Sequence, residues 1–324
     1  MSKANGKGYG KVILFGEHFV VYGIPGIASG IDKFVDVTVE NIKDKNDVIF
    51  DDTVFNEKVS LNEKPDHIKS KIFKAIFNPE NKIIKEILEF NKIEFNNLKF
   101  TIKANFSAAK GLGYSGALAV AIIRSVNNLF ELDLKDNHIN ELAYIAECVS
   151  HGTPSGIDNT CATYGTLVWF EKNMTGGPNT VKPFKCGKPL YLVLADTGIK
   201  HDTKESVANV RKRKEANESD YKKIFDKAKK LASKAKKELQ YGAILEIGKL
   251  MNENQELLRE IGVSCKEAEE IIKVCEYENS VAGKVTGAGD GGNVIILCEN
   301  EKHQDKIIET IKRKNYEGIK IKIS

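Results

Sequence analysis

Residues 110–130 read KGLGYSGALAVAIIRSVNNLF, three glycines around one serine and then an apolar run without glycine or proline. This pattern predicts a flexible loop that enters the N-terminus of a helix. The first amides of a helix have no internal partner and the helix dipole is positive there, so such a loop favours bound anions. We therefore predict that the loop holds the phosphates of a nucleotide. The simpler interpretation is a tight connection.

The loop also matches the dinucleotide pattern G-x-G-x-x-G at Gly111–Gly116. That fingerprint requires a strand that runs directly into the first glycine. Here Asn105–Lys110 separates the loop from the strand predicted at Leu98–Ala104. A second match, Gly287–Gly292, is followed by a predicted strand instead of a helix. The hypothesis that the protein is a dinucleotide oxidoreductase therefore rests only on these two matches. No Walker A sequence is present either.

Composition limits the class of protein. The chain has 324 residues, 41% hydrophobic and 29% charged, which is enough for two ordinary domains. A net charge of +4 is too small to indicate a nucleic-acid partner. The longest clean apolar run, Ala117–Ile123, is too short to cross a membrane, and residues 1–11 lack the core of a signal peptide. Six scattered cysteines without a C-x-x-C pair are typical of reduced thiols, so we expect a cytoplasmic protein with no membrane partner.

Hydrophobic periodicity predicts an α+β chain. Strands are expected at 11–15, 34–40, 47–55, 98–104, 166–171, 190–195, 281–286, 293–298 and 318–323, and helices within 66–90 and 203–261 and at 136–151, 264–276 and 302–314. Residues 151–159, HGTPSGIDN, are expected to form an irregular loop. The Lys-rich stretch Lys222–Lys237 favours a solvated helix face. A stretch rich in Gly, Pro, Lys and Asn at 176–190 predicts two domains, 1–185 and 186–324.

Several polar residues stand at positions that suit chemistry. Lys11 begins a predicted strand, and Glu17 and His18 follow its end. Glu147 lies near the C-terminal end of a predicted helix, where the dipole disfavours negative charge. Asp158 lies in the loop 151–159. Each of these residues, taken alone, also fits an ordinary surface or turn position.

The order of four runs is more specific than any one of them. KVILFGEHFVVYG at 11–23, GLGYSGA at 111–117, HGTPSGIDN at 151–159 and KVTGAGDGG at 284–292 together resemble the GHMP small-molecule kinases. The resemblance extends over the whole chain. It implies a ribosomal S5 domain 2-like N-terminal domain and a ferredoxin-like C-terminal domain with the active site between them. The form of the first and third runs is most similar to the family members that phosphorylate mevalonate.

The resemblance also implies residue roles. ATP would bind through Lys110, Gly111, Leu112, Gly113, Tyr114, Ser115 and Gly116, and Mg²⁺ would be held by Ser115 and Glu147. Asp158 would be the catalytic carboxylate, close to Lys11. Glu17, His18 and Thr203, with Gly287, Ala288 and Gly289, would approach the acceptor, expected to be mevalonate. Family members are often dimers, so a homodimer is expected.

These roles suit phosphoryl transfer, which needs positioning and charge neutralisation. Asp158 can accept the proton of an attacking alcohol, and Lys11 can stabilise the developing alkoxide. Mg²⁺ commonly uses few protein ligands together with phosphate and water. Another small alcohol or sugar as acceptor, and a non-catalytic ligand-binding protein with this fold, remain open alternatives.

The chain departs from the usual family pattern at four positions. Tyr114 and Gly116 stand where Ser and Ala are usual, and Leu118 stands where many members carry Tyr. Asp290 replaces a glycine of the loop 287–292. We expect Tyr114 to add bulk beside the phosphates, and Asp290 to place negative charge near them unless its side chain points away.

Overall fold

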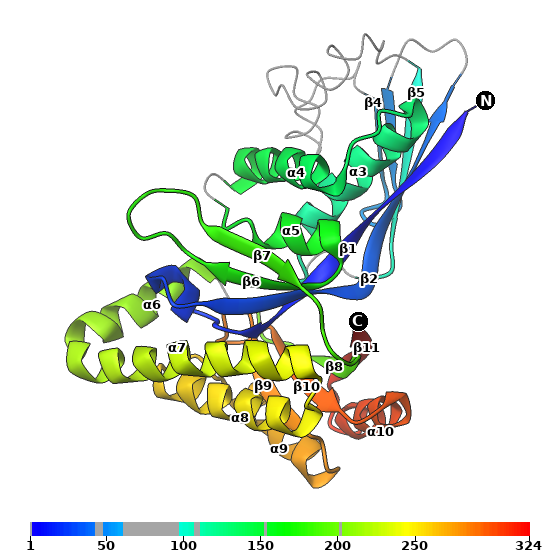
Figure 1. Ribbon diagram of the computed structural model, residues 1–324. Helices are drawn as coiled ribbons and strands as arrows, with labels where there is room; N and C mark the ends of the chain where they lie inside the picture. The colour runs from blue at the N-terminus through cyan, green and yellow to red at the C-terminus, as the bar shows by residue number, and fades with distance from the viewer. Residues whose placement is uncertain (1, 43–47, 61–96, 107–110, 152–153, 201–202) are drawn as a thin grey trace. The chain divides into compact units, whose positions relative to one another are not determined.

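The computed structural model describes residues 2–42, 48–60, 97–106, 111–151, 154–200 and 203–324 (Figure 1). The helices expected within 66–90 lie outside these residues. The chain forms two compact units: unit 1 comprises Met1–Lys11 and Lys33–Gly165, and unit 2 comprises Val12–Asp32 and Thr166–Ser324. Strands β1 (Lys3–Phe15) and β2 (Gly26–Asn41) each contribute residues to both units. The domain boundary between residues 185 and 186 stays a prediction.

Unit 1 is built on a mixed sheet. Strand β2 pairs antiparallel with β5 (Leu98–Ala104), β5 pairs parallel with β3 (Val48–Asp52), and β3 pairs antiparallel with β4 (Glu57–Ser60). The side chains of Val35, Val37 and Val39 are fully buried, as the two-residue period of a strand requires. The rings of Phe50 and Phe100 stack with their centroids 4.9 Å apart. These contacts form the sheet side of the core of unit 1.

The described residues of unit 1 also form three helices, α3 (Tyr114–Phe130), α4 (Asp136–His151) and α5 (Ile157–Tyr164), and each contacts the other two. Two glycines let β1 lie directly against α3. A Cβ added to Gly8 would lie 2.0 Å from the carbonyl oxygen of Ala117, and one added to Gly6 would lie 2.1 Å from that of Ala121. Any larger residue would therefore push the strand off the helix.

Two sequence-based expectations were wrong. Helix α5 begins at Ile157, inside the stretch expected to form an irregular loop. The hydroxyls of Thr160 and Thr163 bond back to carbonyls four residues earlier, at 2.7 and 2.8 Å, so these β-branched residues are satisfied inside a helix. Strand β7 (Thr180–Phe184) lies where only a boundary region was expected. Tertiary packing outweighed local propensity in both stretches.

Unit 2 contains a four-stranded antiparallel sheet in the order β11-β8-β10-β9 (Figure 1). The strands are β8 (Leu190–Asp196), β9 (Ala282–Thr286), β10 (Asn293–Cys298) and β11 (Glu317–Ile323). Helices α8 (Ile244–Glu260), α9 (Lys266–Tyr277) and α10 (Glu301–Lys312) pack against this sheet. The N-terminal part of β2 pairs with β6 (Leu167–Glu171), which pairs with β7. The mixed helix and strand content confirms the predicted α+β class.

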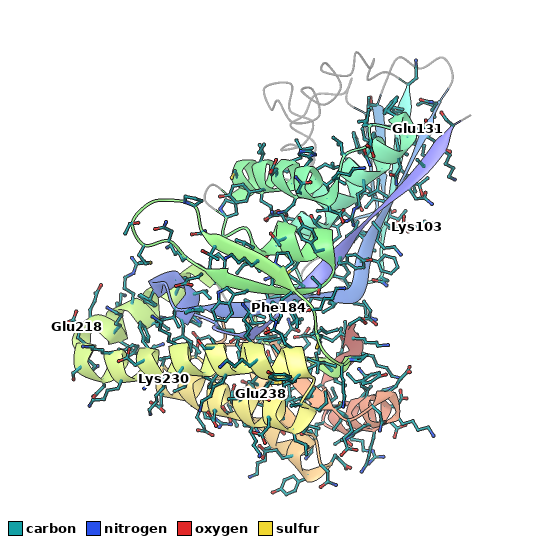
Figure 2. The ribbon with its side chains drawn as sticks, viewed as in Figure 1. Lys103, Glu131, Phe184, Glu218, Lys230 and Glu238 are labelled. Carbon is teal, nitrogen blue, oxygen red and sulfur yellow. The ribbon has the colours of Figure 1, made fainter. Side chains whose placement is uncertain are left out.

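The predicted helical region 203–261 divides into α6 (Thr203–Ala216), α7 (Glu218–Tyr241) and α8. The apolar residues of α7 repeat at helical spacing and are buried, among them Tyr221, Ile224, Ala228, Leu231, Ala235 and Leu239. Glu218 and Lys230 of the same helix project away from the protein (Figure 2). The predicted solvated face is confirmed, with one exception. Lys236 Nζ lies 4.8 Å from the ring centroid of Trp169, a cation–π contact.

A buried ion pair links the two sequence segments of unit 2, Val12–Asp32 and Thr166–Ser324. Lys284 of β9 donates to Glu17 Oε1, and Asn254 of α8 donates to Glu17 Oε2 at 3.3 Å. Lys284 Nζ also donates to the carbonyl oxygen of Val285 at 2.6 Å, and both charged side chains are fully buried. Burial lowers the pKa of Lys284, and attraction to Glu17 opposes that effect. Each charge is therefore tolerated only because the other is present.

We predict that the single substitution Lys284→Met leaves Glu17 buried without its cation. Removing one partner of a buried pair costs about 3–5 kcal/mol of unfolding free energy. The double variant Glu17→Gln with Lys284→Met removes both charges and should recover most of that loss. Urea denaturation of the three proteins measures the effect. Equal midpoints for wild type and Lys284→Met would contradict the prediction.

Candidate active site

Strand β1 carries Lys11 to the side of Asp158. The backbone N–H of Lys11 donates to the carbonyl oxygen of Leu112 at 2.8 Å, which ties the strand to the glycine loop. Lys11 Nζ lies 3.2 Å from Asp158 Oδ1, and 14% and 31% of the two side chains are exposed. Asp158 stands in the first turn of α5. The predicted proximity of these two residues is therefore present in the structure.

Lys11 is held in its charged form. Burial, the largest effect, acts to lower its pKa. Attraction to Asp158 and the hydrogen bond to it act in the opposite direction, with smaller electrostatic contributions from Cys161 and Glu147. The net result is a pKa of Lys11 above its ordinary value. The pair therefore presents an ammonium group beside a carboxylate.

Because they have no side chain, two glycines of the loop let its backbone pack closely against Lys11 and Asp158. Gly113 precedes α3 with φ 71°, and a Cβ added there would lie 2.8 Å from Lys11 Cγ. A Cβ on Gly116 would lie 3.0 Å from the carbonyl carbon of Asp158, so α3 and α5 meet at this point. Gly111 has φ 68°, and no atom of the described residues lies within 4 Å of its Cβ position. Its backbone can therefore meet a ligand without steric hindrance. Lys110 lies outside the described residues.

Tyr114 does not add bulk where it was expected. Its ring is only 6% exposed and packs edge-on against Phe55 and Phe106, with centroid distances of 5.7 and 6.0 Å. Burial raises the pKa of its hydroxyl, which has no hydrogen-bond partner among the described residues. Only the backbone amide of Tyr114, at the N-terminus of α3, is left for a phosphate. Leu112 is likewise buried and meets Lys11 through its carbonyl.

The expected metal ligands lie on neighbouring helices. Ser115 is the second residue of α3, and Glu147 of α4 is 4% exposed. Glu147 is close enough to Lys11 to raise its pKa electrostatically. In the part of the chain that the structure describes, no three His, Cys, Asp or Glu residues lie close enough together to hold a metal ion by themselves. One hydroxyl and one carboxylate suit Mg²⁺, which takes its other oxygen ligands from phosphate and water.

The residues expected to approach an acceptor lie in unit 2. His18 Nε2 lies 2.6 Å from the carbonyl oxygen of Ala288, which joins the Gly16–His18 turn to the loop 287–292. Gly287 and Gly289 have φ values of 87° and 66°, which explains the glycines. The side chain of Glu17 is fully buried and accepts hydrogen bonds from Lys284 and Asn254. Thr203 is the exposed first residue of α6. The predicted residues thus form two groups, one in each compact unit.

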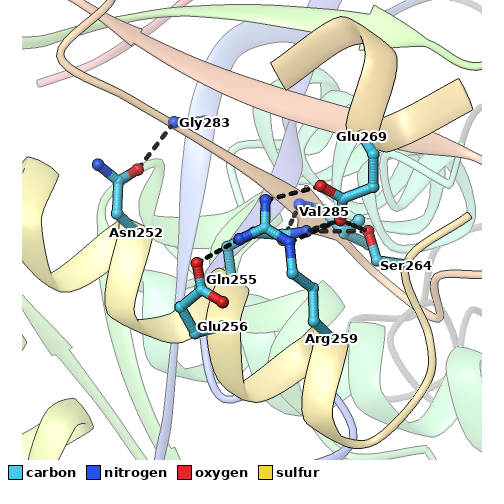
Figure 3. A network of polar contacts seen from close by, with 8 residues as sticks. All are labelled: Asn252, Gln255, Glu256, Arg259, Ser264, Glu269, Gly283 and Val285. Atoms are coloured by element: carbon cyan, nitrogen blue, oxygen red, sulfur yellow. Dashed lines mark hydrogen bonds and ion pairs between the residues drawn. The ribbon is translucent and has the colours of Figure 1, made fainter. Parts of the chain in front are cut away.

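A polar network holds the strand that leads into the loop 287–292 (Figure 3). The outer-edge amides of Gly283 and Val285 donate to Asn252 Oδ1 at 3.3 Å and Gln255 Oε1 at 2.9 Å. Gln255 Nε2 donates to Glu269 Oε1 at 3.0 Å, and Arg259 donates to both oxygens of Glu269. Two side chains of α8 therefore satisfy amides on the free edge of β9, and Glu269 of α9 holds one of them, Gln255, in place.

Sequence reasoning missed four residues that bond to Glu17, to strand β9 or to the loop 287–292. They are Lys284, Asn254, Gln255 and Ser206. One of them carried a signal in the sequence, because Lys284 stands between Gly283 and Val285 in an apolar predicted strand. A charged residue in such a strand indicates a buried partner. The other three lie in helices whose polar residues are too numerous to single out.

Comparisons with known proteins identify the family. The chain matches the family model of the GHMP kinases N terminal domain at residues 81–166 and that of the GHMP kinases C terminal domain at residues 231–318. A mevalonate kinase from Pyrococcus furiosus is 34% identical over 303 residues, covering 91% of this chain and 89% of that protein. A mevalonate kinase from Methanocaldococcus jannaschii is 29% identical, with 96% of each chain covered.

A solved structure gives the same result. The crystal structure of L. major mevalonate kinase in complex with R-mevalonate superposes with a TM-score of 0.83 and 32% sequence identity, covering 100% of this chain and 99% of that chain. Both sequence and fold therefore agree over nearly the whole length. The expected two-domain fold is confirmed, and this chain belongs to the GHMP kinase family.

Proposed function

We propose that this chain transfers the γ-phosphoryl group of ATP to the primary hydroxyl of mevalonate, giving ADP and 5-phosphomevalonate. The observation that carries the proposal is the Lys11–Asp158 pair, 3.2 Å apart beside the glycine loop that begins α3. Its support from comparison is the similarity to mevalonate kinases over most of the chain.

The reaction assigns one role to each member of the pair. The acceptor oxygen forms a bond to the γ-phosphorus while the bond from that phosphorus to the β–γ bridging oxygen breaks, and ADP leaves. Asp158 accepts the hydroxyl proton as the acceptor attacks. The Lys11 ammonium stabilises the negative charge that develops on the acceptor oxygen. The first backbone amides of α3 bind phosphate oxygens, helped by the positive end of the helix dipole.

Mg²⁺ and ATP fit the residues that are present. Ser115 and Glu147 would hold the metal, because both supply oxygen and Glu147 is a buried carboxylate near the cation-paired site. When bound, the metal neutralises phosphate charge during transfer. The loop from Lys110 to Gly116 would hold the phosphates through its backbone. The side chain of Tyr114 takes no part in this assignment.

We assign acceptor recognition to His18, Thr203 and the backbone of Gly287–Gly289. The short contact between His18 Nε2 and a carbonyl oxygen places a proton on Nε2. Burial lowers the pKa of His18, so the ring is neutral near pH 7 and Nδ1 keeps a lone pair. This Nδ1 is buried with no hydrogen-bond partner among the described residues. A hydroxyl group of the acceptor is a suitable donor to it. Glu17 acts at a distance, through its pair with Lys284.

Location and assembly belong to the same proposal. All six cysteines are unpaired, which supports the reducing environment of the cytoplasm. No helix among the described residues is long and apolar enough to cross a membrane. A homodimer is proposed from the family resemblance alone.

Replacing the proposed base separates chemistry from binding. We predict that Asp158→Asn lowers kcat at least about 100-fold, the usual contribution of a general base, with a much smaller change in KM. ADP release is measured with Mg·ATP and mevalonate, phosphomevalonate, galactose, homoserine or no acceptor.

Asp133→Asn is the matched control, because Asp133 is an exposed carboxylate that also pairs with a lysine. Turnover of mevalonate that persists in Asp158→Asn would contradict the assigned role. Turnover with a different acceptor would replace the substrate and keep the reaction class. ATP binding without turnover on any acceptor would favour a non-catalytic protein.

The neutral state of His18 predicts a pH dependence of stability. Its folded-state pKa lies below the ordinary 6.5, so the unfolded chain binds the extra proton first as the pH falls. The contribution of His18 is therefore present above about pH 6.5 and is lost as the pH falls through its lower folded-state value. Glu17 and Asp290 act to raise this pKa, and Arg213 acts to lower it.

We predict a smaller acid-induced drop in melting temperature for His18→Asn than for wild type, measured between about pH 7.5 and about pH 5.5. Asn tolerates the φ of 58° found at this position. Parallel pH profiles for the two proteins would show that His18 does not titrate differently on unfolding.

A further inference from the structure

Asp290 occupies a backbone position that favours glycine. It is the only charged residue in the loop GAGDGG, and its φ of 54° lies in the left-handed region. The four glycines of the loop have positive φ as well. Asp adopts this region more readily than most residues, but glycine does so without steric cost. A side chain kept here is expected to make a compensating interaction.

That interaction is with helix α6. Ser206 Oγ donates a short hydrogen bond to Asp290 Oδ2. Ser206 is 3% exposed and is the fourth residue of α6, near the positive end of the helix dipole. A hydrogen bond to a carboxylate is stronger than one between neutral groups. The carboxylate of Asp290 is therefore bonded to a side chain in the first turns of α6.

The backbone of Asp290 adds a second connection. Its N–H donates to the carbonyl oxygen of Val263 at 2.8 Å. From α6, Arg213 donates to the carbonyl oxygens of Ile261 and Gly262, at 3.0 and 3.1 Å. The segment 261–263 thus bonds to both the loop 287–292 and α6. The Asp290–Ser206 bond then joins the loop directly to α6, so each of the three parts is bonded to the other two.

The bond also connects the residues assigned to the acceptor. Thr203 and Ser206 are three positions apart on α6, so they share one helix face. Ala288, two residues before Asp290, is bonded to His18. Asp290 is near enough to His18 to raise its pKa electrostatically. One carboxylate therefore fixes the start of α6 to the same loop that holds His18.

We propose that Asp290 is a positioning residue for the acceptor site, acting through Ser206 to hold the first turn of α6 against the loop 287–292. It sets the affinity for the acceptor and leaves the phosphoryl-transfer step unchanged. This inference rests on the proposed function, because Thr203 and His18 are assigned to the acceptor there. The family glycine at this position lacks the bond.

The test uses the full chain and three substitutions: Asp290→Gly, Asp290→Asn and Ser206→Ala, with the double variant Ser206→Ala and Asp290→Gly. Asp220→Asn is the matched control, an exposed Asp on α7 that pairs with a lysine. Steady-state kinetics with mevalonate and ATP give kcat and both KM values. Hydrogen–deuterium exchange of residues 203–216 gives the order of α6 without a ligand.

The expected result is a KM for mevalonate about tenfold higher in Asp290→Gly and Ser206→Ala, with kcat and the KM for ATP unchanged. Asp290→Asn keeps an acceptor oxygen and should show a smaller rise. The double variant should be no worse than either single one, because both remove the same bond. Exchange of α6 should be faster in Asp290→Gly. That variant should still fold, since glycine suits the left-handed backbone.

An unchanged KM for mevalonate in Asp290→Gly and Ser206→Ala would overturn the inference, as would additive effects in the double variant. A loss of kcat in Asp290→Gly and Ser206→Ala with no change in the KM for mevalonate would also overturn it, since a positioning residue for the acceptor changes that KM. If wild type fails to phosphorylate mevalonate, the proposed function fails, and exchange decides the inference separately. Faster exchange of α6 in Asp290→Gly and in Ser206→Ala supports the role of Asp290, and exchange at the wild-type rate in these two variants overturns it.

Discussion

The direct contact of strand β1 with helix α3 is the constraint on which unit 1 depends. Gly6 and Gly8 bring the strand onto the helix backbone, at a separation that no side chain would permit. Three residues beyond Gly8 the chain reaches Lys11, whose N–H bonds to the glycine loop at Leu112. The same helix meets α5 at Gly116, beside Asp158. Close packing at glycines therefore sets the separation of the two residues assigned to catalysis.

Electrostatics has opposite uses in the two units. In unit 1 the Lys11–Asp158 pair remains partly exposed and meets the N-terminus of α3, so its charges are available to a ligand. In unit 2 the Glu17–Lys284 pair is fully buried, and each residue neutralises the charge of the other. A pair of the first kind suits chemistry, because its groups can exchange partners during a reaction. A pair of the second kind fixes a local structure.

The chain's departures from the family pattern find partners inside the fold. Tyr114 fills a space between two phenylalanines, and Asp290 bonds to a serine of α6. Gly116 allows α3 and α5 to approach more closely than the usual alanine would. These departures alter the packing near the two groups of candidate residues. The residues Lys11, Ser115, Glu147 and Asp158 are all retained. The similarity to mevalonate kinases is consistent with that retention.

The sequence by itself determined the family, the α+β class and helices such as α3 and α4, because the ordered runs and strong periodicity are local properties of the chain. It also identified Lys11 and Asp158 as candidates. Only the tertiary structure showed that Ile157–Tyr164 is helical, that Glu17 is enclosed by Lys284, and that the ring of Tyr114 and the carboxylate of Asp290 meet Phe55 and Ser206. These outcomes depend on contacts between residues far apart in the chain, and local sequence does not encode which partner a side chain meets.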